Sequence, residues 1–464
     1  MEDLATAAIE HAAKLGAEFA DIRLEQSSGV SLVVMDGKTR TLAAQKDEGC
    51  GIRAFMGGMW GFASSDGLSK SSVKAAASEA VKMARAARSK VKVEFKIRPE
   101  KPVRLAEEYR CREPVSEVPM EDKLEYVMSL DGSMRTFDPR ITSTNSRYDD
   151  LEVQRVVSNT FGTQVRTLER WVLASCSAYA KAEGVIQRGH APLGNVGGFE
   201  LVRGEAAHSL GVEAASMAIR LLDTKPAPAG MFTCVLDNKM TGLLAHEAFG
   251  HACEADGVLA GASVLEDKVD KQVAVEAVNM YDDPTVKNTF GYYSVDWEGV
   301  KSKRHVLVER GILKGFLHNL ETGSRMGITP SGSARSQAYS SPPIIRMSNT
   351  YFGPGDCKKD ELIEEVKAGL LIKGSQYGYV EPAKGQFMFK CDEAYQIKDG
   401  ELGQRYRDAS ISGIILDVLN NVQGMADDFT LTDPGYCGKG GQIARTTDGG
   451  PHMCVKDMVV GGLT

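Results

Sequence analysis

The chain has 464 residues, of which 42% are hydrophobic and 25% charged, and its formal net charge is -7. These proportions are those of a globular protein with a sizeable core, and the length predicts about three domains. There is no polybasic run, which argues against nucleic acid as a partner, and no apolar stretch approaches the roughly 20 residues that span a bilayer, which argues against a membrane.

The N-terminus and the cysteines indicate a cytoplasmic protein. Residues 1–19 carry early acids and lack the apolar core of a signal peptide, so they predict an amphipathic helix. Nine cysteines are scattered along the chain without a CxxC pair, which is not typical of a disulfide framework or a zinc ribbon. In a reducing compartment, any special cysteine would be a metal ligand or a nucleophile.

Residues 1–95 are predicted to form an N-terminal α/β domain. Short strands are expected around a hairpin turn at Asp36-Gly37, because both residue types accept a positive φ cheaply. A helix rich in Ala, Lys and Arg is expected over 71–87, with a serine in position to cap it. Residues 91–119 are charged and contain four prolines, and we interpret them as a linker.

Residues 120–222 are predicted to form a central α/β domain. Helices are expected over 121–134 and 204–222, and polar, β-branched segments between residues 141 and 179 are expected to be short strands. The order helix, strands, helix predicts a sheet covered by helices on one face. A proline-rich break follows at 225–230.

The third predicted domain, residues 228–464, is β-rich. It begins with a strand over 232–236 and a helix over about 239–251. Short segments separated by Gly, Pro and Asp follow, with one more helix predicted over 359–369. The fold class is therefore predicted to be α+β, with an α/β N-terminal half and a β-rich C-terminal half.

The pattern that carries chemistry lies in the helix predicted over 239–251. His246-Glu247-Ala-Phe-Gly250-His251 resembles the H-E-x-x-H zinc helix, in which two histidines bind zinc and the glutamate activates water, but it is one residue longer. In a regular α-helix, residues five apart lie about 140° apart around the axis, against about 40° for residues four apart. Either a π-bulge, which absorbs the extra residue, or a loosening at Gly250 would bring the imidazoles together. The alternative is a solvated helix face, because a chance match to this pattern is not rare.

A catalytic zinc site needs a third protein ligand and an open position for water. The residues alone leave several candidates: Cys437, Cys454, His305, His318, Glu254 and Asp256. Cys437 lies in a glycine-rich loop that can approach a metal closely, although a lone cysteine is more often a small buried hydrophobe. The residues therefore favour Cys437 only mildly. Arg346 and Tyr339 are candidate donors to an oxyanion, although each is more often structural.

Several segments, taken in chain order, are similar to the TldD/PmbA family of metallopeptidases. They are Gly51-Ile-Arg-Ala-Phe-Met-Gly-Gly-Met-Trp-Gly-Phe-Ala-Ser64, the helix pattern H-E-A-x-G-H-x-x-E-x-D from His246, Asp282-Asp-Pro284, Asp296-Trp-Glu-Gly299, Arg346-Met-Ser-Asn-Thr350 and Cys437-Gly-Lys-Gly-Gly-Gln442. The resemblance covers nearly the whole chain.

The resemblance implies a metal site. TldD-type members bind zinc through both histidines of H-E-x-x-x-H and through the cysteine of the C-G-K loop. Carried over, this implies His246, His251 and Cys437 as Zn2+ ligands and Glu247 as the catalytic base. The tail that follows adds His452 and Cys454 close to the ligand loop, which departs from the family pattern.

The resemblance also implies an activity and partners. Family members degrade or trim unfolded peptides, including leader peptides of modified microcins. The catalytic subunit often pairs with a TldE- or PmbA-type paralogue that lacks the metal ligands. This chain keeps the ligands, so we expect a zinc-dependent peptidase that works as a homodimer or with such an inactive paralogue. Its substrate is expected to bind extended, as an added strand at an exposed sheet edge.

Three alternatives remain open from the sequence. The first is a non-catalytic peptide-binding subunit of a peptidase complex. The second is a cysteine peptidase whose nucleophile is Cys437 or Cys454. The third is a structural metal site, which would need a fourth protein ligand.

Overall fold

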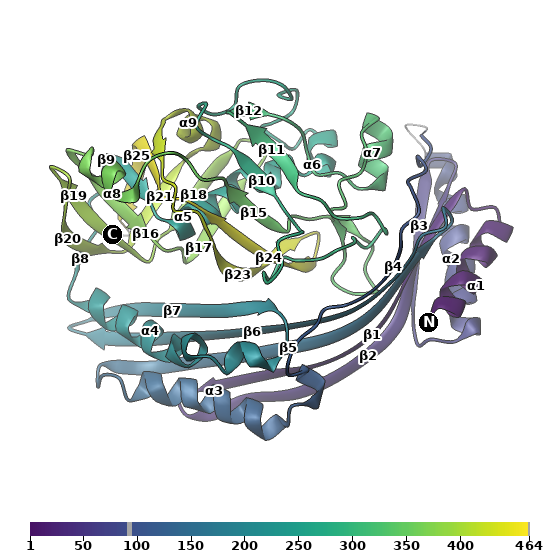
Figure 1. Ribbon diagram of the computed structural model, residues 1–464, viewed down its shortest axis with the longest axis horizontal. Helices are drawn as coiled ribbons and strands as arrows, with labels where there is room; N and C mark the ends of the chain where they lie inside the picture. The colour runs from purple at the N-terminus through teal and green to yellow at the C-terminus, as the bar shows by residue number, and fades with distance from the viewer. Residues whose placement is uncertain (91–94, 463–464) are drawn as a thin grey trace.

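The computed structural model describes residues 1–90 and 95–462. A long curved N-terminal sheet, with helices α1 to α4 packed on it, holds a C-terminal body built around two further large sheets (Figure 1). The fold class is α+β, as predicted. In the described part of the chain, no helix is long and apolar enough to cross a membrane.

The N-terminal sheet runs through both of the first two predicted domains. Its strand order is β3-β2-β1-β5-β6-β4, with β7 added beside β6. Its strands are β1 (Phe19–Met35), β2 (Lys38–Met56), β3 (Met59–Asp66), β4 (Arg104–Glu108), β5 (Ile141–Asn159), β6 (Gln164–Ala182) and β7 (Val185–Val196). The junction between the two segments is the antiparallel pairing of β1 with β5, from Asp21 opposite Asn159 to Met35 opposite Asn145.

The strands of this sheet are longer than the short ones predicted. Strand β1 has 17 residues and continues through Ser27-Ser28-Gly29, a polar stretch that resembles a break in the sequence. Gly29 serves close packing there, because a Cβ atom would lie 2.5 Å from the carbonyl oxygen of Asp150 on β5. The predicted linker 91–119 is also partly wrong, since it contains β4. Residues 91–94 of that linker lie outside the described residues.

Four helices pack on the N-terminal sheet, and the C-terminal body lies on its opposite, concave side (Figure 1). They are α1 (Glu2–Lys14), α2 (Lys70–Ala87), α3 (Met120–Arg135) and α4 (Glu205–Leu222). Helix α2 begins with a capping box in which the Ser69 side chain accepts from the backbone N–H of Ser72.

On the concave side, the buried Arg53 guanidinium donates to Asp21 of the same sheet and to Glu298 of the C-terminal body, 2.8 Å away. These paired buried charges fix the body against the sheet.

The larger C-terminal sheet has the order β17-β18-β21-β25-β9-β16-β19-β20-β8, and β22 pairs with β25. Its strands are β8 (Lys225–Pro226), β9 (Gly230–Leu236), β16 (Ala368–Lys373), β17 (Tyr377–Glu381), β18 (Gln386–Lys390), β19 (Glu393–Lys398), β20 (Glu401–Arg407), β21 (Ala409–Ile414), β22 (Val422–Met425) and β25 (Met453–Gly462). The predicted helix over 359–369 is too long: α8 (Lys359–Glu364) ends early because the following residues enter β16.

The second C-terminal sheet has the order β12-β11-β10-β15-β24-β23, and a small pair, β13 with β14, lies apart from it. Its strands are β10 (Met280–Asp282), β11 (His305–Glu309), β12 (Ile312–Leu313), β15 (Asn349–Phe352), β23 (Thr430–Lys439) and β24 (Gln442–Gly450); the small pair is β13 (Ala334–Arg335) and β14 (Ile344–Ile345). Three short helices complete the body: α6 (Ala255–Leu259), α7 (Leu320–Met326) and α9 (Ile415–Asn420).

The helical segment that carries the H-E-x-x-x-H pattern packs between the two C-terminal sheets. It consists of α5 (Asn238–Leu243), a π-helical turn (Leu244–Gly250) and a 3-10 turn (His251–Cys253). The Asp237 side chain caps its start by accepting from the backbone N–H of Met240 at 2.9 Å. The π-helical turn contacts β15 and β24 on one side and β17 and β18 on the other, so the two sheets fix the histidines between them.

Candidate metal centre

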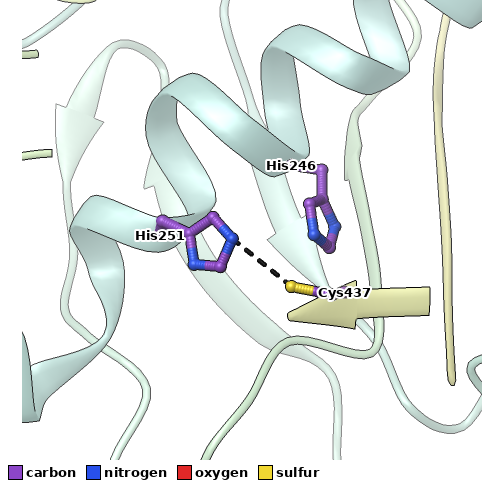
Figure 2. Close-up of side chains that lie close together, drawn as sticks. All are labelled: His246, His251 and Cys437. Atoms are coloured by element: carbon purple, nitrogen blue, oxygen red, sulfur yellow. Dashed lines mark hydrogen bonds between the residues drawn. The ribbon is translucent and has the colours of Figure 1, made fainter. Parts of the chain in front are cut away.

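The extra residue of the H-E-x-x-x-H pattern is absorbed by the π-helical turn. The backbone N–H of His251 donates to the carbonyl of His246, five residues earlier. The two imidazoles therefore lie on one side of the helix, with ring centroids 5.4 Å apart (Figure 2). The π-bulge is thus confirmed. The loosening at Gly250 is wrong, because that residue keeps helical dihedrals, with φ -60° and ψ -45°.

Gly250 is needed for space rather than for its backbone freedom. A Cβ atom at this position would lie 2.2 Å from Sδ of the buried Met347 and 3.0 Å from the carbonyl oxygen of Ala245. Met347 leads into β15, which packs against the π-helical turn. The absence of a side chain at Gly250 therefore lets the metal-site helix approach β15 closely.

We expect Gly250→Ala to destabilise the protein by about 1–3 kcal/mol, because the added methyl group overpacks a filled core. Thermal or urea unfolding measures this directly. Gly257→Ala is the matched control: it also lies in a helix, but its Cβ would meet nothing within 4 Å, so it should leave stability unchanged or raise it by up to about 1 kcal/mol. Equal stability of the two variants would contradict the packing role of Gly250.

The structure brings three of the predicted site residues to one point. One donor atom each from His246, His251 and Cys437 lies within 4.8 Å of the other two. Sγ of Cys437 is 3.3 Å from Nε2 of His251 (Figure 2). Two imidazole nitrogens and one thiolate form a donor set that suits zinc, and three ligands leave a fourth position free for water or substrate.

The position of Cys437 is fixed by a buried arginine. Cys437 lies near the end of β23, in the hairpin that β23 forms with β24. The Arg346 guanidinium, only 1% exposed, donates to the backbone carbonyl of Cys437 and, at 3.1 Å, to that of Gln442. Arg346 therefore acts on the hairpin backbone, and its amino groups are engaged there rather than aimed at a substrate oxyanion.

The three donors shift one another's pKa values. Burial alone would raise the pKa of the Cys437 thiol, but the neighbouring imidazoles lower this pKa to about 4. Burial alone would lower the pKa of His246, but the charge of Cys437 raises it to about 9. Burial alone would also lower the pKa of His251, but its hydrogen bonds to Cys437 and Glu254 raise this pKa well above its usual value. The cysteine is therefore held as a thiolate, which is the form that binds a metal.

Glu247 lies beside this cluster without belonging to it. Its carboxylate oxygen is 3.7 Å from Nε2 of His251, and its side chain is 29% exposed, against 13% for His251. His246 and Cys437 are thus buried, whereas His251 and the adjacent Glu247 are partly exposed. This arrangement leaves Glu247 available for proton transfer to a molecule bound at the site.

The other candidate ligands lie elsewhere or have different partners. Cys454 belongs to the core beneath α8, where burial raises its pKa to about 11. His452 pairs with Asp428 at 2.6 Å, His305 contacts the carbonyl of Ser331, and His318 contacts Thr322. Asp256 pairs with Lys439. The Tyr339 hydroxyl donates to Asp47 and Asp66, which places it away from the cluster.

Sequence reasoning missed the roles of Glu254 and Lys439. Glu254 was weighed as a metal ligand, whereas the structure places its carboxylate 2.9 Å from Nδ1 of His251, on the side away from Cys437. Lys439 follows Cys437 by two residues and reaches the same carboxylate at 3.2 Å. The signal for Glu254 was its spacing three residues after His251, which is contact distance on a helix.

Comparison with known proteins covers nearly the whole chain. Residues 20–84, 113–222 and 229–462 match the first, central and C-terminal domains of the PmbA/TldA metallopeptidases. A protein of Methanothermobacter thermautotrophicus named metalloprotease is 39% identical over 451 residues, which is 96% of each chain. A protein of Saccharolobus solfataricus named zinc metalloprotease TldD homolog is 27% identical over 98% of this chain and 99% of its own.

The fold is also that of a solved structure. The crystal structure of TldE from Thermococcus kodakarensis superposes with a TM-score of 0.76 at 19% identity, covering 99% of this chain and all of the other. At this identity, the likeness concerns the fold alone.

Proposed function

This chain belongs to the PmbA/TldD family of metallopeptidases, and we propose that it is a zinc-dependent peptidase acting on unfolded or short peptides. The observation that carries the proposal is the convergence of His246, His251 and Cys437, whose donor atoms lie within 4.8 Å of one another. The printed name of the Saccharolobus relative, a zinc metalloprotease, supports the choice of metal.

Glu247 is the general base in this proposal. When bound by the three donors, zinc supplies Lewis acidity towards the reacting carbonyl and water. The Glu247 carboxylate, 3.7 Å from His251 and partly exposed, accepts the proton of the attacking water. Glu247 then delivers this proton to the leaving amine, so one residue serves both steps of peptide hydrolysis.

The substrate is proposed to bind as an added strand. Within the described residues, strands β17 and β23 each stand at the end of their sheet, paired with β18 and β24 respectively. Strand β23 carries Cys437, and β17 packs against the π-helical turn. The free backbone groups of such edges pair with an extended peptide irrespective of its sequence. A folded protein does not offer an extended backbone, so this mode selects unfolded peptides.

A cysteine peptidase is the second candidate, because the Cys437 thiolate lies 3.3 Å from an imidazole nitrogen. A nucleophile must reach the substrate carbonyl, however, and Cys437 is only 5% exposed. A purely peptide-binding subunit is the third candidate. It would have no use for three converging donors beside a partly exposed carboxylate, so zinc catalysis is favoured over both.

We further propose that the protein acts in the cytoplasm as a dimer, either with a second copy or with a TldE- or PmbA-type paralogue that lacks the metal ligands. A TldE-type chain has the same fold, as the Thermococcus structure shows, so either form pairs two chains of one architecture. Co-purification of the two chains from a common expression vector, compared with the size of this chain alone, distinguishes a heterodimer from a homodimer.

Metal removal tests the proposed function. Treatment with a chelator should abolish cleavage of an unstructured peptide, and stoichiometric Zn2+ should restore it. Zinc content is followed by atomic emission and cleavage by mass spectrometry. Cleavage that persists after the metal is gone would overturn the zinc mechanism. Recovery on adding zinc without any reductant also distinguishes it from cysteine catalysis.

Zinc affinity should rise with pH up to about pH 9. Histidine must lose its proton to bind a metal, and the pKa of His246 is raised to about 9, so protons compete with zinc below that pH. Cys437, with a pKa of about 4, is already a thiolate at pH 7 and adds no competition. For each proton that zinc displaces, zinc affinity should rise by up to about tenfold per pH unit. Calorimetry in two buffers should show net proton release at pH 7, and zero release would contradict the raised histidine pKa values.

A further inference from the structure

A carboxylate outside the three donors, that of Glu254, contacts the ring nitrogen of His251 that faces away from Cys437. Oε2 of Glu254 is 2.9 Å from Nδ1 of His251, and the Glu254 side chain is only 3% exposed. With a proton on Nδ1 shared with this carboxylate, the lone pair of Nε2 faces Cys437 and the converging point. The carboxylate thus sets both the tautomer and the orientation of the His251 ring.

A lysine on the cysteine strand reaches the same carboxylate. Cys437 and Lys439 are two apart on β23, so their side chains leave the strand on the same face. Nζ of Lys439 lies 3.2 Å from Oε2 of Glu254 and 2.7 Å from Oδ2 of Asp256. Lys439 also donates to the carbonyl of Ile345 at 3.1 Å. One side chain therefore ties the strand of the thiolate to the helical segment of the histidines.

The buried carboxylate of Glu254 favours a cation in contact with it, because a buried carboxylate is costly unless its charge is compensated. A metal-bound histidine is neutral, so His251 itself would give Glu254 a hydrogen bond but no charge, and the charge of a bound ion would act through that ring. Among the described residues, Lys439 is the lysine or arginine in direct contact with Glu254. It is only 23% exposed, so solvent screens the pair incompletely.

We propose that Glu254 and Lys439 are a positioning pair, which holds the His251 ring and the Cys437 thiolate in the one geometry that binds zinc. The inference rests on the proposed function. It assigns to neither residue a contact with substrate or metal. The pair couples two donors that are 186 residues apart in the sequence, which local helix geometry cannot align with each other.

The test compares Glu254→Gln, Lys439→Met and the double variant by zinc affinity, measured in competition with a chromogenic chelator. Each single change should weaken zinc binding by about 10- to 100-fold, the usual effect of losing the partner of a ligand. The double variant should lose little more zinc affinity than the single variant that binds zinc more weakly, because the two residues act as one unit. Lys358→Met is the control, since it removes an exposed lysine that precedes α8 and pairs with Asp427, and it should leave zinc affinity unchanged.

Two further measurements separate positioning from general stability. The metal-free variants are unfolded thermally, and the visible spectra of their Co2+-loaded forms are recorded, because these report ligand geometry. Positioning predicts altered spectra and weaker affinity in Lys439→Met, even where its metal-free form is as stable as the wild type. Wild-type zinc affinity in Lys439→Met, or losses that simply multiply in the double variant, would overturn the inference alone. A wild-type protein that binds no zinc would overturn the proposed function, and this inference with it.

Discussion

Replacing Cys437 with alanine is expected to remove zinc and peptide cleavage together. Zinc sites are worth roughly 10–16 kcal/mol shared among about four ligands, so one ligand carries about 3 kcal/mol, or on the order of a hundredfold in affinity. The loss should exceed this average, because Cys437 supplies the negatively charged donor of the cluster, whereas the other two donors are imidazoles. The variant should therefore leave purification without stoichiometric zinc.

Cys454→Ala is the matched control for that experiment. Both cysteines are 5% exposed, but Cys454 lies in the core beneath α8, with no place in the donor cluster. This control should keep its zinc and its turnover and lose at most some stability. If Cys437→Ala retained zinc while Cys454→Ala lost it, the assignment of the third ligand would be reversed.

The sequence predicted that the two histidines of the helix converge, but not how the helix brings them together. The six-residue pattern from His246 to His251 predicted two imidazoles that a regular helix would separate, and hence a local distortion. It could not decide between the π-bulge and Gly250, because that choice depends on packing against Met347 and β15, far along the chain. The sequence analysis considered Gly250 for its backbone freedom, whereas the structure uses its lack of a side chain.

The third donor, Cys437, could not be identified from the residues around it alone. Cys437 and Cys454 are both buried cysteines near the C-terminus, and their residue types are identical. What separates them is the pairing of strands, which places Cys437 opposite Ala444 in the smaller C-terminal sheet and Cys454 opposite Val235 in the larger one, in the core beneath α8. From the residues alone Cys437 was favoured only mildly; the family resemblance selected it, and the structure places its sulfur beside both histidines.

In the N-terminal half, too, the sequence predicted local structure but not the long-range pairing of strands. The helices are local and were predicted within a few residues, as Ser69 and its capping box illustrate. The single sheet depends on pairing Asp21 with Asn159, across more than a hundred residues. Polar stretches such as Ser27-Ser28-Gly29 look like turns until a neighbouring strand supplies the hydrogen bonds that keep them extended.

Glu247→Gln is expected to keep zinc and lose turnover. Glutamine has nearly the same shape as glutamate, and Glu247 is not one of the three donors, so metal content should equal that of the wild type. An amide cannot accept the proton of the attacking water, and loss of a general base costs about 10²- to 10⁴-fold in rate. Because the group acts in the transition state, kcat should fall while KM changes little.

The same substitution made at an exposed glutamate distinguishes this role from a change in overall charge. Glu276 pairs with Arg310 at the surface and is 67% exposed, so Glu276→Gln should leave both zinc content and kcat unchanged. Undiminished kcat in Glu247→Gln would mean that another group takes the proton. Zinc lost together with turnover would instead make Glu247 a ligand, and the side chain 3.7 Å from His251 would then have to close onto the metal rather than stand beside it. Zinc content and kcat measured on one preparation therefore separate a base from a ligand, which neither measurement does alone.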